Sequence, residues 1–162
     1  MMQREDTSFF LKLIWKSIAI RLRREFGTGG LAFLYHQGRL TGLALAERYR
    51  KMGVKNLKNV VENLLIHAFA LGRYRGELVH FSYGRPHLQN SIIIRLRDGW
   101  ECMVAKRHKL NEPSFHFERG VLAGLIEGFL GDRKTVLVEE VKYIAKGDPY
   151  CGFTATFPSE TR

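Results

Sequence analysis

The sequence contains little cysteine, little proline and no long apolar run. Two cysteines and four prolines occur in 162 residues. Two cysteines cannot build the disulfide framework of a small secreted domain, and they do not form a Cys-x-x-Cys pair. Lys12, Lys16 and Arg21 interrupt the apolar N-terminal segment, so no stretch reaches the roughly 18 apolar residues of a membrane span. These absences predict a cytoplasmic protein without a membrane span.

Acidic residues are also scarce relative to basic ones. The chain has 26 Lys and Arg against 16 Asp and Glu, a net charge of +10. Such an excess fits an anionic ligand, a nucleic acid or simple solubility. Basic residues cluster at Arg21/Arg23/Arg24, at Arg48/Arg50/Lys51 and at Lys106-Arg107-His108-Lys109. No helix-turn-helix, RNP or zinc-finger motif accompanies them, which argues against nucleic acid as the partner.

The usual motifs of catalysis are missing too. The six histidines form no His-x-x-x-His or His-Glu-x-x-His pair, and no Gly-x-Ser-x-Gly elbow occurs. The run Gly27-Thr28-Gly29-Gly30 has no strand before it and no Lys-Ser/Thr after it, so it is not a phosphate-binding loop. We therefore assign no catalytic residue.

Periodicity predicts the order of the elements. Apolar residues at helical spacing indicate a first helix up to Phe26, a second from Leu31 to about Met52 and a third over 57–71. Alternation over 78–83 and 91–96 predicts a β-hairpin. Residues 100–109 fit either a strand end or a short helix. A helix over 116–130 and strands over 135–145 and 150–157 complete an α+β fold with an antiparallel sheet.

The helix over 116–130 carries glycines at positions 120, 124 and 128, all on one face. Three glycines inside a helix cost about 3 kcal/mol relative to alanine. A stable helix must recover this cost by letting another group approach its backbone closely. Tight packing against a neighbouring element is the first interpretation, and a flat floor beneath a ligand is the second.

The segment after this helix is the most informative. An alternating strand ends in Glu140-Val141-Lys142-Tyr143, and a turn and returning strand follow as Gly147-Asp148-Pro149-Tyr150-Cys151-Gly152-Phe153. This order of parts resembles the V4R (vinyl-4-reductase) domain, a small-molecule-binding module with the fold of the Bet3 transport-particle subunits. The resemblance implies one domain over 1–162. Its helical part covers 1–73, its hairpin 74–99 and its signature region 100–158.

In V4R domains that bind zinc, the resemblance implies four ligand positions. Two of them hold suitable donors here, Glu140 and Cys151, while the other two hold Phe115 and Tyr143. A structural zinc site needs four donors. We therefore predict that the metal has been lost, that the two aromatic rings fill its space, and that no cofactor is required. Cys102 and His116 are the other donors that could rejoin the site, although their spacing does not require it.

The resemblance also implies an apolar cavity between helices and sheet. Its candidate lining residues are Phe81, Trp100, Phe115, His116, Phe117 and Tyr143. The function that follows is a stand-alone binding or sensory domain for a hydrophobic molecule (aromatic, lipid-like or tetrapyrrole-like) that signals to a partner protein. Alternatives are an enzyme or accessory of tetrapyrrole 4-vinyl reduction and a basic nucleic-acid-binding protein. The family's N-terminal helices commonly dimerise, so Trp15 with Gly38 and Gly42 are expected at a homodimer interface.

Overall fold

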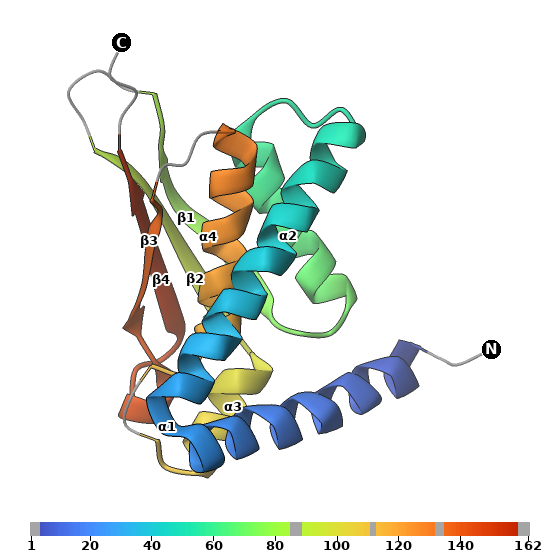
Figure 1. Cartoon of the computed structure of the whole chain (residues 1–162), viewed down its shortest axis with the longest axis vertical. Coiled ribbons are helices and arrows are strands. Elements are labelled where there is room, and N and C mark those ends of the chain that lie inside the picture. The colour runs from blue at the N-terminus through green and yellow to red at the C-terminus, as the bar shows by residue number, and fades with distance from the viewer. Residues whose placement is uncertain (1–3, 85–88, 111–112, 132–134, 159–162) are drawn as a thin grey trace.

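A computed structural model describes residues 4–84, 89–110, 113–131 and 135–158. Helices cover one face of a four-stranded antiparallel sheet, which confirms the predicted α+β class (Figure 1). The core lies between this face of the sheet and the helices α2 and α4, and it is built from aliphatic side chains and phenylalanines. Within the described residues, no helix is long and apolar enough to cross a bilayer.

Helix α1 spans Arg4–Lys51 and bends sharply at Gly27. There the backbone adopts φ 52° and ψ −131°, a conformation that only glycine reaches readily. The predicted break at residues 27–30 is therefore a one-residue kink that joins the two expected helices. The first half of α1 projects away from the sheet, while the second half runs along α4 (Figure 1).

Helix α2 (Leu57–Ala70) matches the expected helix over 57–71. Asn56 caps its start, because the side chain accepts a hydrogen bond from the backbone N–H of Asn59 at 2.8 Å. The next element is the predicted hairpin, β1 (Arg75–Ser82) and β2 (Asn90–Arg97). Strand order is β1-β2-β4-β3, with β4 (Cys151–Phe157) in the interior and β3 (Leu137–Lys142) at one edge.

Strand β3 is shorter than predicted. Its pairing with β4 becomes irregular between Glu140 and Lys142, and the chain then forms a short 3-10 helix, η1 (Ile144–Lys146). Asp148 holds this turn by accepting a hydrogen bond from the backbone N–H of Tyr143 at 3.0 Å. Up to that point the strand alternates regularly, so Glu140 faces the core while Glu139 stays exposed.

Residues 100–109, left open by the sequence, form a short helix α3 (Trp100–Arg107). Helix α4 (His116–Leu130) has the predicted bounds and ends at Gly131, whose φ of 72° closes the C-terminus. Gly120 and Gly124 of its glycine face lie against the backbone of the second half of α1, and Gly128 lies against the side chain of Ala46, which confirms the packing interpretation. Gly38 and Gly42 lie in the same contact. The prediction that they form a dimer interface is therefore wrong, because α4 of the same chain already covers them.

Candidate functional site

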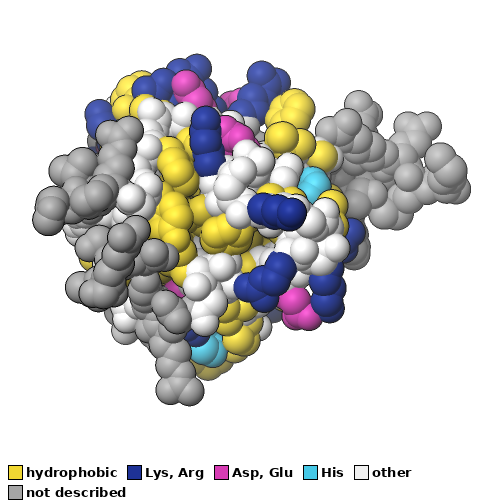
Figure 2. All heavy atoms as spheres, turned by 90° about the horizontal axis from the view of Figure 1, so that it is seen from above, with side chains coloured by type: hydrophobic (Ala, Val, Ile, Leu, Met, Phe, Trp, Pro, Cys, Tyr) yellow, Lys and Arg dark blue, Asp and Glu magenta, His cyan; other side chains and the backbone are white. Residues whose placement is uncertain are grey.

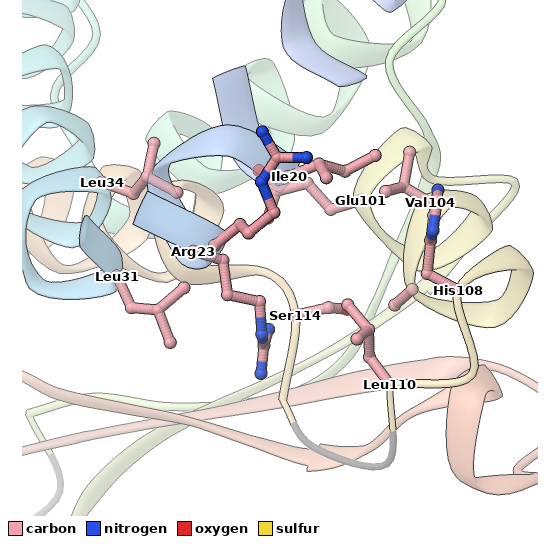
Figure 3. Close-up of a pocket in the computed structure, with 11 residues that line it drawn as sticks. Ile20, Arg23, Leu31, Leu34, Glu101, Val104, His108, Leu110 and Ser114 are labelled. Carbon is pink, nitrogen blue, oxygen red and sulfur yellow. The ribbon is translucent and has the colours of Figure 1, made fainter. Parts of the chain in front are cut away.

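Two neighbouring cavities lie where the first half of α1 crosses α3 and the start of α4. The first has a volume of about 250 Å³. Figure 3 shows Leu31 and Leu34 of α1 on one side of it and Val104 and His108 of α3 on the other. Leu110 and Ser114, from the segment between α3 and α4, complete its lower side in this view. The cavity is thus mainly apolar, with two arginines, a histidine and Glu101 among its lining residues.

The second cavity, about 240 Å³, opens on the other side of Glu101, a residue that lines both. Aromatic side chains form much of its wall. They come from the segment after α2, from α3 and from the start of α4: Tyr74, Trp100, Phe115 and Phe117. Burial raises the pKa of Tyr74 to about 12, so its hydroxyl stays protonated and can act as a hydrogen-bond donor.

A buried ion pair gives the second cavity its polar character. Arg73 pairs with Glu118, whose side chain is 5% exposed. The guanidinium also lies over the ring of Phe117, 5.4 Å from its centroid. One carboxylate oxygen of Glu118 and the indole Nε1 of Trp100 are buried and form no hydrogen bond with any described group. Both residues belong to the lining of the second cavity.

Of the six predicted cavity residues, the structure brings three together. Trp100, Phe115 and Phe117 line the second cavity. Phe81 packs against the core from β1, and Tyr143 follows β3 with Lys146 over its ring. Neither of these two belongs to the described lining of the cavities.

His116 also lies apart from the described lining. Its Nε2 is 3.0 Å from the carbonyl oxygen of Pro113. Burial, followed by the charge of Arg119, lowers the pKa of His116 to about 4. The imidazole is therefore neutral at pH 7, and its Nε2–H donates to that carbonyl.

Sequence reasoning missed Arg73, Tyr74, Glu101 and Glu118. One signal was available for Glu118, because it shares the apolar stripe of α4 with Leu122 and Leu125 at helical spacing. A charged residue in such a stripe is buried only when it has a partner or a function. No comparable signal marks Arg73, since it reaches Glu118 from a segment 45 positions away.

A second constellation lies beneath α3. Cys102 of α3 and Cys151 of β4 are joined as a disulfide, and the carboxylate of Glu140 lies beside them. Glu140 Oε2 accepts hydrogen bonds from the backbone N–H groups of Ser114 (2.7 Å) and Phe115 (3.2 Å). Burial raises the pKa of Glu140 to about 7, although these two hydrogen bonds oppose the shift. No pattern in the sequence indicated that the two cysteines pair.

The geometry of these residues shows whether the ligand positions implied by the V4R resemblance could hold zinc. Phe115 is buried with its ring edge-on to Phe153, centroids 5.4 Å apart, so it provides packing. Cys102 supplies a third donor next to Glu140 and Cys151, and all three lie within 4.8 Å of one another. Two thiolates and a carboxylate are of the donor types that zinc prefers, and they supply three of its four ligands. Zinc bound there would hold α3, β3 and β4 together.

The basic residues do not form one continuous stripe on the face shown in Figure 2. There the Lys and Arg side chains lie at several separate places, with hydrophobic and neutral side chains between them. Some basic residues of the chain have partners within it. Arg39 pairs with Glu127 at 2.7 Å, and Lys51 pairs with Glu47 at 2.6 Å.

Comparison with known proteins identifies the fold of the chain. No protein-family model matches the chain, and no curated protein matches it in sequence. Solved structures do share its fold, among them two whose bound molecules are known. The first is the phenol-responsive sensory domain of the transcription activator PoxR with phenol, at TM-score 0.78 and 16% identity. That match covers 90% of this chain and 74% of the PoxR chain.

The second structure is a trafficking protein particle complex subunit 3 from Naegleria fowleri, covalently bound to palmitic acid. The match has a TM-score of 0.65 and 15% identity, and it covers 96% of this chain and 97% of the subunit. The chain therefore has the V4R/Bet3-like fold that its C-terminal signature predicted. At this level of identity the likeness concerns the fold alone.

Proposed function

We propose that this chain is a binding domain for a hydrophobic small molecule held in the two cavities around Glu101. Binding of that molecule would be signalled to a partner protein. The observation that carries the proposal is the pair of largely apolar cavities at the junction of α1, α3 and α4. An apolar lining with a few polar groups is the usual form of a small-molecule site. The two similar structures, whose bound molecules are phenol and palmitic acid, add support from the fold.

The size and lining of the cavities limit the class of ligand that they can bind. Each cavity is slightly smaller than the roughly 300–1,000 Å³ typical of drug-sized ligands. A single aromatic ring fits one cavity, and an elongated molecule would extend past Glu101 into both. The unpartnered N–H of Trp100 donates to a ligand oxygen, while Phe115 and Phe117 contact the ring or chain.

The kink of α1 offers a route for the signal. Residues of the first half of α1 line both cavities, Ile20 and Arg23 in the first and Ile14 in the second. If the first half of α1 has two positions relative to the rest of the chain, a ligand that binds more tightly to one of them shifts the population towards it. The movement would take place at the Gly27 kink. The readout would then be the surface of α1.

A homodimer is the first partner we propose. Several large apolar side chains of α1 are exposed, notably Phe26, Phe33 and Leu40 at 68%, 53% and 47%. A second copy packed along α1 would cover them. The side chain of Trp15, also predicted at this interface, lies outside the described residues.

Ligand capture tests the proposal directly. Native mass spectrometry of freshly purified protein, followed by denaturing extraction, would identify a co-purified molecule. Calorimetric titration with phenols, aromatic acids and fatty acids of increasing chain length would then define the preferred class. We expect saturable one-site binding by at least one class, and no binding by any class would contradict the proposal.

Two variants locate the site. Trp100→Phe keeps an aromatic ring but removes the N–H. It should therefore weaken the binding of an oxygen-bearing ligand about tenfold, which corresponds to the loss of one hydrogen bond of about 1.4 kcal/mol. Met103→Leu is the matched control, since Met103 is 57% exposed on the same helix. Equal affinity for both variants would place the ligand outside the second cavity.

A further inference from the structure

We propose that Cys102, Glu140 and Cys151 form a buried binding site for a thiophilic divalent metal ion, zinc being the probe, when the two cysteines are reduced. Cys102 is the new element. It belongs to α3 and occupies none of the four ligand positions that the V4R resemblance implies. The proposal does not depend on whether the cavities bind a ligand.

The three donors converge from three elements of the fold. One ligand atom from each residue lies within 4.8 Å of the other two. Zinc binds thiolate sulfur at about 2.3 Å and carboxylate oxygen at about 2.0–2.2 Å, so two donors on one ion stand at most about 4.6 Å apart. Small side-chain rotations therefore bring all three donors onto a single ion.

The backbone spacing of the two cysteines favours a bridging ion. Their Cα atoms are 7.3 Å apart. Disulfides usually join Cα atoms about 4.4–6.8 Å apart. An ion between two thiolates spans a longer gap than a direct sulfur–sulfur bond, because two metal–sulfur bonds replace one. The fold thus holds α3 and β4 at a distance that suits the reduced, metal-bound pair.

Glu140 supplies an independent indication. Its side chain is 7% exposed, and Oε2 already accepts two backbone N–H groups. Oε1 is buried and forms no hydrogen bond with any described group. A buried carboxylate oxygen without a partner is costly. A cation bound between Oε1 and the two sulfurs removes that cost and leaves the hydrogen bonds of Oε2 in place.

Counting donors along the sequence found only Glu140 and Cys151, and on that count we predicted no metal. Cys102 was named as a donor that could rejoin them although its spacing did not require it, and the packing of α3 brings it to Cys151 of β4 across 49 positions of sequence. Cys102 is 1% exposed, whereas its neighbour Met103 on the same helix is 57% exposed.

Oxidation would empty the site. A low-molecular-weight disulfide takes two electrons and two protons from the two thiols and becomes two free thiols. The protein gains the Cys102–Cys151 bond, and the thiolates that would hold the ion are consumed. The disulfide form and the metal-bound form are therefore mutually exclusive.

The test uses the full chain after reduction with a phosphine. One equivalent of zinc is then added, and unbound zinc is removed. Native mass spectrometry and elemental analysis should show one zinc per chain. Cobalt(II) in place of zinc should give thiolate-to-cobalt charge-transfer absorption, which reports sulfur ligation directly. Protein oxidised with glutathione disulfide beforehand should bind neither ion.

Variants then assign the ligands. Cys102→Ser should lower the affinity for zinc at least tenfold and reduce the cobalt–thiolate band. Glu140→Gln should also lower the affinity for zinc. His116→Gln and Tyr143→Phe should retain full affinity, because neither side chain belongs to the cluster. Far-UV circular dichroism checks that each variant folds.

Two results would overturn the proposal. One is folded, fully reduced wild-type protein that retains no zinc and gives no cobalt–thiolate band. The other is unchanged zinc affinity in folded Cys102→Ser, which would show that any metal is bound without α3.

Discussion

Gly124 of α4 lies directly against the backbone of Arg39 in α1. A Cβ atom at Gly124 would collide with the carbonyl oxygen of Arg39. The relation repeats along the interface, where Gly120 meets the backbone of Tyr35, and Gly42 of α1 meets that of Val121. Glycines on both helices thus allow a close crossing, which fixes the second half of α1 while its first half extends beside the cavities.

Replacement of Gly124 should therefore destabilise the protein. Gly124→Ala gains up to about 1 kcal/mol of helix propensity, but it forces two backbones apart, and overpacking of this kind typically costs about 1–3 kcal/mol. We expect a net loss of unfolding free energy, measured by urea denaturation. Gly29→Ala is the control, because a Cβ there meets nothing within 4 Å. Equal stability of the two variants would contradict the tight crossing.

The pKa of His116 predicts a specific pH dependence. Burial and Arg119 lower this pKa to about 4, against about 6.5 in the unfolded chain. Between these values the unfolded chain binds more protons than the native one, so stability rises with pH. The contribution is complete above pH 6.5 and is lost as pH falls towards 4. With His116 partly exposed, its size should be on the order of 1–2 kcal/mol.

The measurement is the difference in unfolding free energy between the wild type and His116→Gln at pH 7, 6, 5 and 4. This difference should fall as the pH is lowered. The same series with His36→Gln, at an exposed histidine, serves as reference. A difference that stays constant for His116→Gln would show that the imidazole is as easily protonated in the folded chain as in the unfolded one.

The fold followed from the sequence wherever local signals agree with the packing. Helix α4 was predicted to the residue, because apolar spacing defines its face and Gly131 ends it. Helix α3 was left open, since eight residues are too few for periodicity to separate a helix from a strand. The end of β3 was misplaced because its bulge after Glu140 depends on pairing with β4.

The candidate site was less predictable for the same reason. Of the six cavity residues that the resemblance implied, Trp100, Phe115 and Phe117 line one of the two cavities, and the other three line neither. Arg73 and Cys102 act through partners that lie far away in the sequence, Glu118 and Cys151. Only the packing of α3 and α4 brings these pairs together, and no spacing rule within one segment records it.

Reduction of the Cys102–Cys151 disulfide should destabilise metal-free protein. The two residues are 49 positions apart, and closing a loop of that length typically contributes about 2–4 kcal/mol by restricting the unfolded chain. Urea denaturation of the oxidised protein, with and without a phosphine and with a chelator throughout, measures this loss. Cys102→Ala should be insensitive to the phosphine. An unchanged wild-type midpoint on verified reduction to two thiols would contradict the prediction.

Filling the first cavity distinguishes it from the second as the place where a ligand binds. Val104 lines only the first and is half-buried on α3. In Val104→Phe the larger ring should occupy part of the 250 Å³ space and preserve or raise the melting temperature, because it buries apolar surface. A ligand that enters the first cavity should then bind at least tenfold more weakly in calorimetric titration. A ligand confined to the second cavity should bind Val104→Phe with unchanged affinity and remain sensitive to Trp100→Phe, which would restrict the site to the aromatic side of Glu101.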